Sequence, residues 1–474
     1  MNGPATAIVL AAGAGRRFGG GKLAAGLQGR PILQHVLDAL AAAGIDDPVV
    51  VVGEDEKALD AVMDWGAARR VRNPDPGRGL SSSLRLGWEA AQARTPGPYA
   101  TLVVLGDQPR LDPVVVRALL AQPADPGRPV VVARHADGAR NPVRLEPEAA
   151  ALVAIAAGDR GLGPLLDARP ELVRTVDVAT GNPDVDERAD LVALLAEAWA
   201  ARVRANAAQV ETIREVPDGH DFYAPVRRTF VADPARADDP VLEDLLARAR
   251  ADETWLDIGS GAGRYALPLA RRVRRVIAVD PSPGMLEALR AGMAAHGIGN
   301  VQVHEGTWPP DASLRAALGT FPVADVAMIA HVSYDIEAIV PFVEAMESAA
   351  RRECVAVLME RNPASAAGPF WPPVHGLERV PLPGLGEFTE LLAARGVNPE
   401  VMRLATARRR WTDRDELVSF LRRQLWTAPG SAADERLMAA VDRLATTDDD
   451  GRLVVSGLPP VAIGIVAWKP AESR

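Results

Sequence analysis

The chain has little of what would place it outside the cell, in a membrane or on nucleic acid. One cysteine among 474 residues, Cys354, excludes an internal disulfide and fits a reducing cytoplasm. No apolar run reaches the roughly 18 to 20 residues that a membrane-spanning helix needs, and the apolar segment 6–12 lacks the preceding basic residues of a signal peptide. The net charge of −9 gives no support to nucleic-acid binding. We therefore expect a cytoplasmic protein that acts on small molecules.

Length and composition indicate two globular domains. At 474 residues the chain exceeds one ordinary core, and short apolar runs alternate with helical patterns, which predicts the α/β class. The alanine-rich stretch 196–210 has no Gly/Ser/Pro cluster and predicts a helical connector. We therefore predict two doubly wound, Rossmann-like, three-layer domains in tandem, over residues 1–198 and 216–474, joined by a helical linker over 199–215.

Residues 7–23, AIVLAAGAGRRFGGGKL, predict a buried strand that ends in a phosphate-binding loop. Glycines let backbone N–H groups face an anion, while Arg16 and Lys22 supply positive charge that amides alone lack. Two familiar phosphate loops do not match. The P-loop pattern fails because Leu23 follows the lysine, and the dinucleotide pattern fails because Gly19 comes one residue too late.

An acidic residue follows another predicted strand in the first half of the chain. Residues 101–105 form an apolar strand that ends in the turn Gly-Asp-Gln-Pro, which puts Asp107 just beyond the carboxyl end of the strand. Open α/β sheets bind their ligands at that edge. A single acid there suits Mg²⁺ shared with substrate phosphates, because this ion takes one or two carboxylates and keeps several waters.

The loop pattern LAAGxGxRxGxxK resembles the signature of the nucleotidyltransferases that include the molybdenum-cofactor cytidylyl- and guanylyltransferases. In that family the loop wraps the triphosphate of an NTP, and the acceptor attacks the α-phosphorus with release of pyrophosphate. The resemblance extends over residues 5–195. The loop residues that it assigns to nucleotide binding or catalysis are Leu10, Ala11, Ala12, Gly13, Gly15, Arg16, Gly19 and Lys22.

The same resemblance implies a magnesium site and a base-binding loop. The turn at Asp107 is the family's metal-binding turn, and either Asp184 or Asp186 would supply a second carboxylate; we favour Asp186. Cytidylyl enzymes carry LAAG where guanylyl enzymes carry LAGG, so this chain is expected to use CTP.

A G-x-x-x-S loop contacts base and acceptor in that family, which points to Gly79, Ser81 and Ser82. The alternative is that one of these serines only caps the helix that we predict over 84–93.

The second half begins again with a strand and a glycine-rich turn. Residues 254–258, TWLDI, run into the turn 259–264, GSGAGR, and a second strand over 276–279 ends in Asp280. An acid about 20 residues past the glycines can reach the hydroxyls of a ribose. A dinucleotide site is one reading of this spacing, but its third glycine would fall one residue later than Gly263.

The runs LDIGSGAGR and VDPSPGMLEALR resemble motifs of class I methyltransferases, which bind S-adenosylmethionine. An acid inside the first strand favours this family over a dinucleotide-binding one. The chain departs from the family where Thr307 replaces an acid that often binds the adenine amino group, so Trp308 is either a base-stacking residue or an ordinary, partly buried tryptophan. The residues that the resemblance assigns to the cofactor are Asp257, Gly259, Gly261 and Gly263 around methionine and ribose, Asp280 on the ribose hydroxyls, Met285 against adenine, and Trp308.

Later residues of the second half are candidates for contact with the methyl acceptor. A strand over 324–330 leads to His331, Tyr334 and Asp335; for His331 we favour a hydrogen-bonded structural role. Methyl transfer depends mainly on proximity and orientation and can proceed without a strong base. The Pro- and Gly-rich residues 362–386 predict a lid or acceptor loop.

Two more apolar runs complete the predicted second sheet. Residues 354–360 form a strand in which Cys354 is buried and is not a nucleophile. Residues 461–468 form an antiparallel strand at the sheet's edge.

The two resemblances imply a bifunctional enzyme with Mg²⁺, CTP and S-adenosylmethionine as ligands. Its small-molecule substrates include molybdopterin for the first domain, and its product would pass to a molybdoenzyme; no nucleic-acid or membrane partner is expected. A second interpretation is nucleotidyl transfer to a sugar- or alcohol-phosphate, with a tailoring methyltransferase. A third is a first domain that carries a nucleotide-bound cofactor without turnover.

Overall fold

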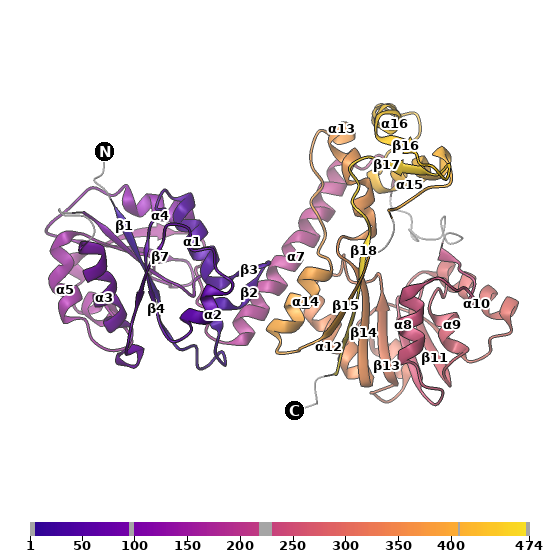
Figure 1. Cartoon of the computed structure of the whole chain (residues 1–474), viewed down its shortest axis with the longest axis horizontal. Helices are drawn as coiled ribbons and strands as arrows, with labels where there is room; N and C mark the ends of the chain where they lie inside the picture. The colour runs from indigo at the N-terminus through magenta and orange to yellow at the C-terminus, as the bar shows by residue number, and fades with distance from the viewer. Residues whose placement is uncertain (1–4, 94–98, 218–229, 406–407, 471–474) are drawn as a thin grey trace. The chain divides into compact units, whose positions relative to one another are not determined.

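The computed structural model describes residues 5–93, 99–217, 230–405 and 408–470 (Figure 1). The chain divides into two compact units, Met1–Leu194 and Leu195–Arg474, each built on one large sheet. The structure assigns the long helix α7 (Arg188–Ile213) to the second unit from Leu195 onward, whereas our predicted linker covers 199–215. No helix within the described residues is both long and apolar enough to cross a membrane.

The first sheet has seven strands in the order β5-β4-β1-β6-β8-β7-β9. β1 pairs in parallel with β4 and β6, and β8 runs antiparallel to both its neighbours. Because β1 lies between strands reached by opposite crossovers, the carboxyl ends of β1 and β6 form a topological switch point, where ligands bind in open α/β sheets. The strands are β1 (Thr6–Ala11), β4 (Val49–Val52), β5 (Arg69–Arg72), β6 (Thr101–Leu105), β7 (Val130–His135), β8 (Val143–Leu145) and β9 (Val173–Val178).

Helices cover both faces of this sheet, so the predicted three-layer α/β architecture is confirmed. Strands buried on both faces explain the unbroken valine and isoleucine runs. Figure 1 shows α3 (Leu80–Gln92) and α5 (Ala150–Ile155) on one face, with α1 (Ile32–Ala42) and α4 (Pro113–Leu120) on the other. The remaining elements are α2 (Glu56–Asp60), α6 (Gly163–Ala168) and the hairpin β2 (Gly26–Leu27) and β3 (Arg30–Pro31).

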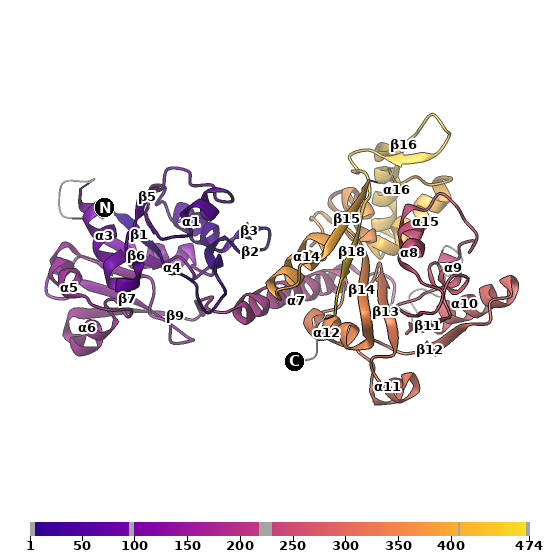
Figure 2. The ribbon, with the colours of Figure 1, turned by 60° about the horizontal axis from the view of Figure 1, so that its bottom comes forward.

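The second sheet also has seven strands, in the order β12-β11-β10-β13-β14-β18-β15 (Figure 2). β18 pairs antiparallel with both β14 and β15. The predicted direction of this last strand is therefore confirmed, but its predicted edge position is wrong, because β15 forms the edge. The strands are β10 (Thr254–Ile258), β11 (Arg275–Asp280), β12 (Val301–Glu305), β13 (Ala324–Ala330), β14 (Ala350–Met359), β15 (Glu400–Ala405) and β18 (Ala462–Trp468).

Cys354 is fully buried in β14, as predicted, and burial raises the pKa of its thiol well above the ordinary value. Helices again lie on both faces (Figure 1). On one side are α8 (Pro240–Arg248), α9 (Ala266–Ala270) and α10 (Pro283–His296); on the other are α12 (Ile339–Ala349) and α14 (Leu385–Ala394), while α11 (Ala312–Leu318) precedes β13.

A helical subdomain, which the sequence patterns did not predict, has its own hydrophobic cluster in the second unit. The C-terminal part of α7 contributes Val210 to it. Phe370 and Trp371 are fully buried there, so the stretch 362–386 is not simply a lid: its aromatics form core. The elements are the 3-10 helix η6 (Pro363–Phe370), α13 (Trp371–His375), α15 (Arg414–Leu425), α16 (Ala432–Leu444), β16 (Ala445–Thr447) and β17 (Leu453–Val455).

Candidate functional sites

The first candidate site lies at the switch point of the first sheet. The glycine loop follows β1, and Lys22 opens a short 3-10 helix, Lys22–Ala24. A Cβ on Gly15 would come within 3.2 Å of Lys22 Cβ, so the missing side chain lets the lysine pack against the loop. The Lys22 side chain is only 10% exposed. The loop therefore directs one buried cation toward the end of β6.

Carboxylates from two distant segments surround that cation. Lys22 Nζ lies 2.6 Å from Asp107 Oδ2 and 3.5 Å from Asp186 Oδ1. The backbone N–H of Val185 donates to the carbonyl of Asp107 at 3.0 Å, which holds the 184–186 segment beside the turn after β6. The structure thus brings together three of the residues that the sequence analysis singled out, across more than 160 positions of the chain.

Repulsion among these carboxylates is a physical signal of a cation site. Partial burial and the nearby charges of Asp107 and Asp186 raise the pKa of Asp184, and a hydrogen bond with Gln108 opposes this effect. Within the described residues, no three or more His, Cys, Asp or Glu side chains are arranged to hold a metal ion. Two carboxylates suffice for Mg²⁺ when substrate phosphates complete its shell. Asp107 and Asp186 therefore fit such an ion.

The two arginines of the glycine loop have different contacts. Arg17 Nη2 lies 2.6 Å from Asp186 Oδ2, whereas the Arg16 side chain is exposed and forms no ion pair with a described residue. Both arginines follow Gly15, and spacing alone does not tell which side chain turns inward. The role of Arg16 in phosphate binding stays a prediction.

The predicted base-binding loop, with Gly79, Ser81 and Ser82, is packed against other segments of the first unit. Gly79 is tightly packed, because a Cβ there would overlap the backbone of Gly158. Ser82 Oγ donates to the Gly79 carbonyl at 2.8 Å and accepts from Asn73 Nδ2 at 2.9 Å, while Ser81 Oγ is buried with no partner in the described chain. The capping alternative is wrong, since Gly79 occupies the N-cap of α3 and no side-chain cap bond forms. The helix also starts at Leu80 and not at residue 84.

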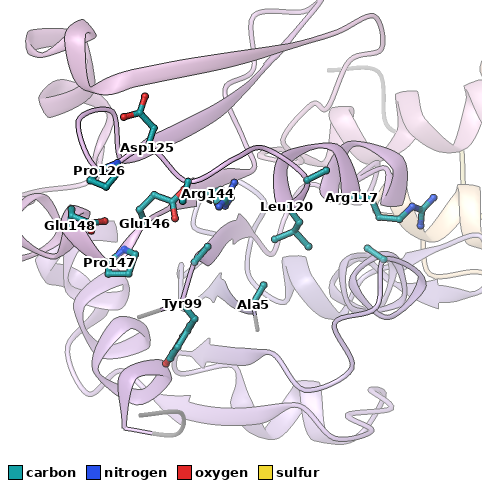
Figure 3. Close-up of a pocket in the computed structure, with 14 residues that line it drawn as sticks. Ala5, Tyr99, Arg117, Leu120, Asp125, Pro126, Arg144, Glu146, Pro147 and Glu148 are labelled. Carbon is teal, nitrogen blue, oxygen red and sulfur yellow. Dashed lines mark ion pairs between the residues drawn. The ribbon is translucent and has the colours of Figure 1, made fainter. Parts of the chain in front are cut away.

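A hollow of about 560 Å³ in the first unit is not the nucleotide site. Figure 3 shows Ala5 and Tyr99 lining it, and these residues precede β1 and β6. The hollow therefore lies at the amino ends of the strands, whereas the glycine loop and Asp107 follow the carboxyl ends. Its buried ion pair, Arg144 Nη2 to Glu146 Oε1 at 2.8 Å, neutralises both partners inside the unit.

The second candidate site lies at the switch point between β10 and β13. Asp280, at the end of β11, accepts hydrogen bonds from the backbone N–H of Gly261 at 2.8 Å and of Ser282 at 2.9 Å. These bonds fix the carboxylate beside the glycine turn. Gly261 has a φ of +52°, and a Cβ there would meet no atom within 4 Å, so the space above it is open.

The other two glycines of the turn serve packing. A Cβ on Gly259 would overlap Val332, and one on Gly263 would overlap Leu289. The sequence pattern does not distinguish the three glycines of this turn. In the structure, only Gly261 among them has open space where a Cβ would be. The Gly263 position instead permits close packing of the turn on α10.

Asp257 is a buried carboxyl group without a cation. Its side chain is buried within β10, its Oδ1 has no hydrogen-bond partner in the described chain, and burial together with the charge of Asp280 raises its pKa to about 7. An unpaired acid of this kind fits a cationic ligand, and S-adenosylmethionine carries a sulfonium and an ammonium group.

Two residues that were predicted to contact adenine are buried. Met285 is 3% exposed in the first turn of α10, where Ser282 caps the helix. Trp308 is 8% exposed and stacks on Phe321 with centroids 6.4 Å apart, and its Nε1 has no partner among the described residues. The tryptophan is thus a packed residue with one free donor.

Comparisons with known proteins agree with this division. Residues 7–174 match the model of the MobA-like NTP transferase domain, and residues 256–349 match that of a methyltransferase domain. The nicotine blue oxidoreductase of Paenarthrobacter nicotinovorans is 31% identical over 204 residues, which cover 40% of this chain and 96% of that protein. The 3-deoxy-manno-octulosonate cytidylyltransferase of Paramagnetospirillum magneticum is 38% identical over 109 residues, or 23% of this chain and 42% of that protein.

Several curated relatives are matched over less than half of their own length. A solved structure, Rv0371c from Mycobacterium tuberculosis H37Rv, is 28% identical, with 40% of this chain and 96% of that chain covered at a TM-score of 0.36. The family models carry the assignment, together with the relative that is matched almost end to end. The chain belongs to the MobA-like NTP transferase family through its first unit and carries a methyltransferase domain in its second.

Proposed function

We propose that the first unit transfers a nucleotidyl group from CTP to a phosphorylated acceptor, molybdopterin or its molybdenum cofactor, and releases pyrophosphate. The observation that carries this proposal is the buried Lys22 between Asp107 and Asp186, beside a glycine loop. One relative is named an oxidoreductase, so the presence of this domain does not by itself determine the reaction. The charged groups at the switch point support phosphoryl chemistry, because a cation and paired acids suit a triphosphate with its metal.

The loop and the charged residues have separate roles in the proposed reaction. Backbone N–H groups of the glycine loop bind phosphate oxygens, and Lys22 counters negative charge that develops as pyrophosphate leaves. Asp107 and Asp186 would hold Mg²⁺, which when bound neutralises the phosphates and polarises the α-phosphorus. Arg17 is free to exchange Asp186 for a phosphate, since both partners lie at the surface. These residues orient the triphosphate, and the acceptor supplies the nucleophile.

For the second unit we propose methyl transfer from S-adenosylmethionine to a small molecule. Asp280 is aligned by two backbone N–H groups to accept from ribose hydroxyls, and Asp257 would pair with the cationic methionine end. Both acids lie at the carboxyl edge of the sheet, where the open space above Gly261 admits the ligand. We also propose a cytoplasmic location and a molybdoenzyme as the recipient of the first product, both on the grounds given by the sequence.

Pyrophosphate release is the decisive measurement for the first unit. Purified protein is incubated with Mg²⁺ and either CTP or GTP, and with molybdopterin or a sugar phosphate as acceptor. Release with CTP and molybdopterin is the expected outcome. Release only with a sugar phosphate would assign a different acceptor, and nucleotide binding without release would make the unit a carrier. Calorimetric titration with S-adenosylmethionine and NADH tests the second unit, and binding of NADH alone would contradict a methyltransferase.

A further inference from the structure

The segment that carries Asp184 and Asp186 has no secondary structure of its own. Residues 181–186 lie between β9 and α7 and belong to neither helix nor strand. No ladder of backbone bonds therefore fixes these acids beside Asp107, which follows β6. Their position depends on individual hydrogen bonds between segments that are far apart in the sequence.

A buried pair of amide side chains, which we call the amide clasp, joins this segment to the turn after β6. Gln108 Nε2 donates to the Asn182 carbonyl at 3.2 Å, and Asn182 Nδ2 donates to Gln108 Oε1 at 3.1 Å. Gln108 is 4% exposed and Asn182 is fully buried, so bulk water does not compete for these bonds. Gln108 also forms a side-chain hydrogen bond with Asp184. The residue next to Asp107 thus holds both the backbone of the segment and one of its acids.

The connection between β7 and β8 holds Asn182 from another side. The Asn182 backbone N–H donates to Asp137 Oδ2 at 2.7 Å, and its Nδ2 lies 3.4 Å from the Asn141 carbonyl oxygen. A Cβ on Gly181 would come within 2.6 Å of the same Asp137 oxygen, so the missing side chain lets this carboxylate reach the backbone. Asn182 is therefore fixed by one segment, and Gln108 takes its position from Asn182.

Resting on the proposed nucleotidyl transfer, we propose that Gln108 and Asn182 are positioning residues that set the spacing between Asp107 and the acids of segment 181–186, and with it the affinity for Mg²⁺ and the triphosphate. The clasp acts through these acids and not on the substrate, because both polar atoms of the Gln108 amide are bonded within the chain.

The geometry that Mg²⁺ requires makes this spacing important. Mg²⁺ needs a near-ideal octahedron of ligands at about 2.0 to 2.1 Å, whereas Ca²⁺ accepts oxygens at about 2.3 to 2.6 Å in flexible geometry. Acids from two separate segments meet the stricter requirement only if the segments are held firmly together. Loss of a hydrogen-bonding partner behind a metal ligand typically lowers metal affinity by roughly 10- to 100-fold. A loosened clasp should therefore weaken the binding of Mg²⁺ more than that of Ca²⁺.

The test is calorimetric binding of α,β-methylene-CTP, a CTP analogue that cannot be cleaved at the α-phosphorus, to the full chain with Mg²⁺, with Ca²⁺ or with EDTA. Gln108→Leu removes the amide at similar volume, while the backbone bond from Val185 to Asp107 remains. Affinity with Mg²⁺ should fall by roughly 10- to 100-fold. Affinity with Ca²⁺ should fall less, and affinity in EDTA should stay unchanged, because the glycine loop and Lys22 are intact.

Gln34→Leu is the matched control for the loss of a buried amide. Gln34 is 5% exposed in α1; its Nε2 donates to Asp38 Oδ1 at 3.0 Å, and its Oε1 accepts from the Asp64 N–H at 2.9 Å. Thermal unfolding should show a stability loss similar to that of Gln108→Leu. The affinity for the analogue with Mg²⁺ should nevertheless equal that of the wild type.

Two further variants test the clasp as a unit. Gln108→Asn keeps the amide on a side chain that is one methylene shorter, so it should show the same selective loss of Mg²⁺ affinity to a smaller degree, including if Gln108→Leu does not fold. Asn182→Ala should lower the affinity with Mg²⁺ by itself, but should add little to the effect of Gln108→Leu, because the same bonds are already lost.

Three outcomes would overturn the proposal: wild-type affinity with Mg²⁺ in the folded Gln108 variants, equal losses with Mg²⁺, Ca²⁺ and EDTA, or the same selective loss in Gln34→Leu. Failure of the wild-type protein to bind the analogue with Mg²⁺ would instead overturn the proposed function on which the inference rests.

Discussion

The two glycine loops of this chain follow the first strand of each sheet, yet their glycines are used differently. In the first loop a Cβ on Gly13, Gly19, Gly20 or Gly21 would meet nothing within 4 Å, whereas in the second a Cβ on Gly259 or Gly263 would overlap a neighbouring side chain. The first loop is open along most of its length, as a long triphosphate requires. The second is packed against the protein and opens only at Gly261, as a compact nucleoside requires. Glycine spacing alone does not tell where a loop leaves space for a ligand, whereas the packing around each glycine does.

The acidic residues of the two sites also differ, in whether a cation of the chain pairs with them. In the first site Asp107 and Asp186 both lie within ion-pair distance of Lys22, so their charges are paired within the chain itself. Asp257 in the second site lies near another acid, Asp280, and pairs with no cation in the part of the chain that the structure describes. The first site therefore balances its acids with a cation of the chain, whereas the second leaves a buried acid unpaired among the described residues.

The largest expected effect comes from breaking the charge arrangement of the first site. Asp107→Asn removes a carboxylate from Lys22 and from the proposed Mg²⁺ shell, and should lower the rate of pyrophosphate release by roughly 10³-fold, comparable to losing a major electrostatic contact. Asp177→Asn, on the exposed edge strand β9, is the matched control and should keep full activity. Near-wild-type release by Asp107→Asn would remove this residue from the mechanism.

The unpaired acid of the second site should make stability depend on pH. Because the pKa of Asp257 is about 7 in the folded state and near 4 when unfolded, the folded protein holds a proton that the unfolded chain has lost between these values. Its stabilising contribution is complete below pH 4 and disappears as pH rises to 7, a change of at most roughly 4 kcal/mol.

Urea unfolding at pH 5 and pH 8 measures this contribution. The second unit of the wild-type protein should lose more stability between these pH values than that of Asp257→Asn. S-adenosylmethionine should reduce the difference, because its positive charge favours the ionised acid. An identical pH dependence in both proteins would show that Asp257 titrates normally.

A pair of alanine substitutions tests the packing difference between the loops. Gly20 and Gly263 have similar φ angles, +90° and +85°, so the backbone strain of an added Cβ, roughly 1 to 2 kcal/mol, should be alike. Only Gly263→Ala must also displace Leu289, which should cost roughly 1 to 3 kcal/mol more. Hydrogen exchange of β1 and β10 reports each unit separately. Equal losses of protection would contradict the packing difference.

Much of the fold could be predicted because both sheets are built from short apolar runs between helical patterns. Strands 101–105 and 324–330 were predicted with their observed bounds. The edge strand β15 and the helical subdomain were missed, since EVMRLA has no continuous apolar run and the subdomain depends on contacts between distant segments. The start of α3 was placed four residues late because serines favour caps, and here tertiary contacts bury them inside the helix.

The candidate sites were predictable where a residue type follows a strand end, as with Asp107 and Asp280. The contacts of a loop residue were not predictable where they depend on the direction of its side chain. Arg16 and Arg17 are neighbours with the same chemistry, and only the structure shows that Arg17 pairs with Asp186. We expected a hydrogen-bonded structural role for His331, but its Nδ1 is buried with no hydrogen-bond partner among the described residues. Whether a histidine finds a partner depends on residues from other elements, and no local pattern records that.

The smallest expected effect concerns the base preference of the first site. The resemblance to cytidylyl enzymes rests on Ala12 in LAAG, and we expect CTP to be preferred over GTP by roughly 10- to 200-fold, the range that shape discrimination provides. The structure shows Ala12 to be 5% exposed and part of the hydrophobic core, where its methyl group packs beneath the loop. Its influence on the base is therefore through loop position more than through direct contact.

Ala12→Gly should accordingly relax the preference by a few-fold and cost about 1 kcal/mol of stability, the value of one buried methyl group. Competition between CTP and GTP at equal concentration, read as nucleotide incorporated into product, measures the preference in both proteins. Ala14→Gly is the control for the same change, because it removes a methyl group from an exposed loop residue that is not part of the core. If wild-type protein incorporates both nucleotides equally, the CTP assignment is wrong while nucleotidyl transfer stands. A complete inversion by Ala12→Gly would show that the methyl group contacts the base itself, since repositioning of the loop alone is expected only to relax the preference.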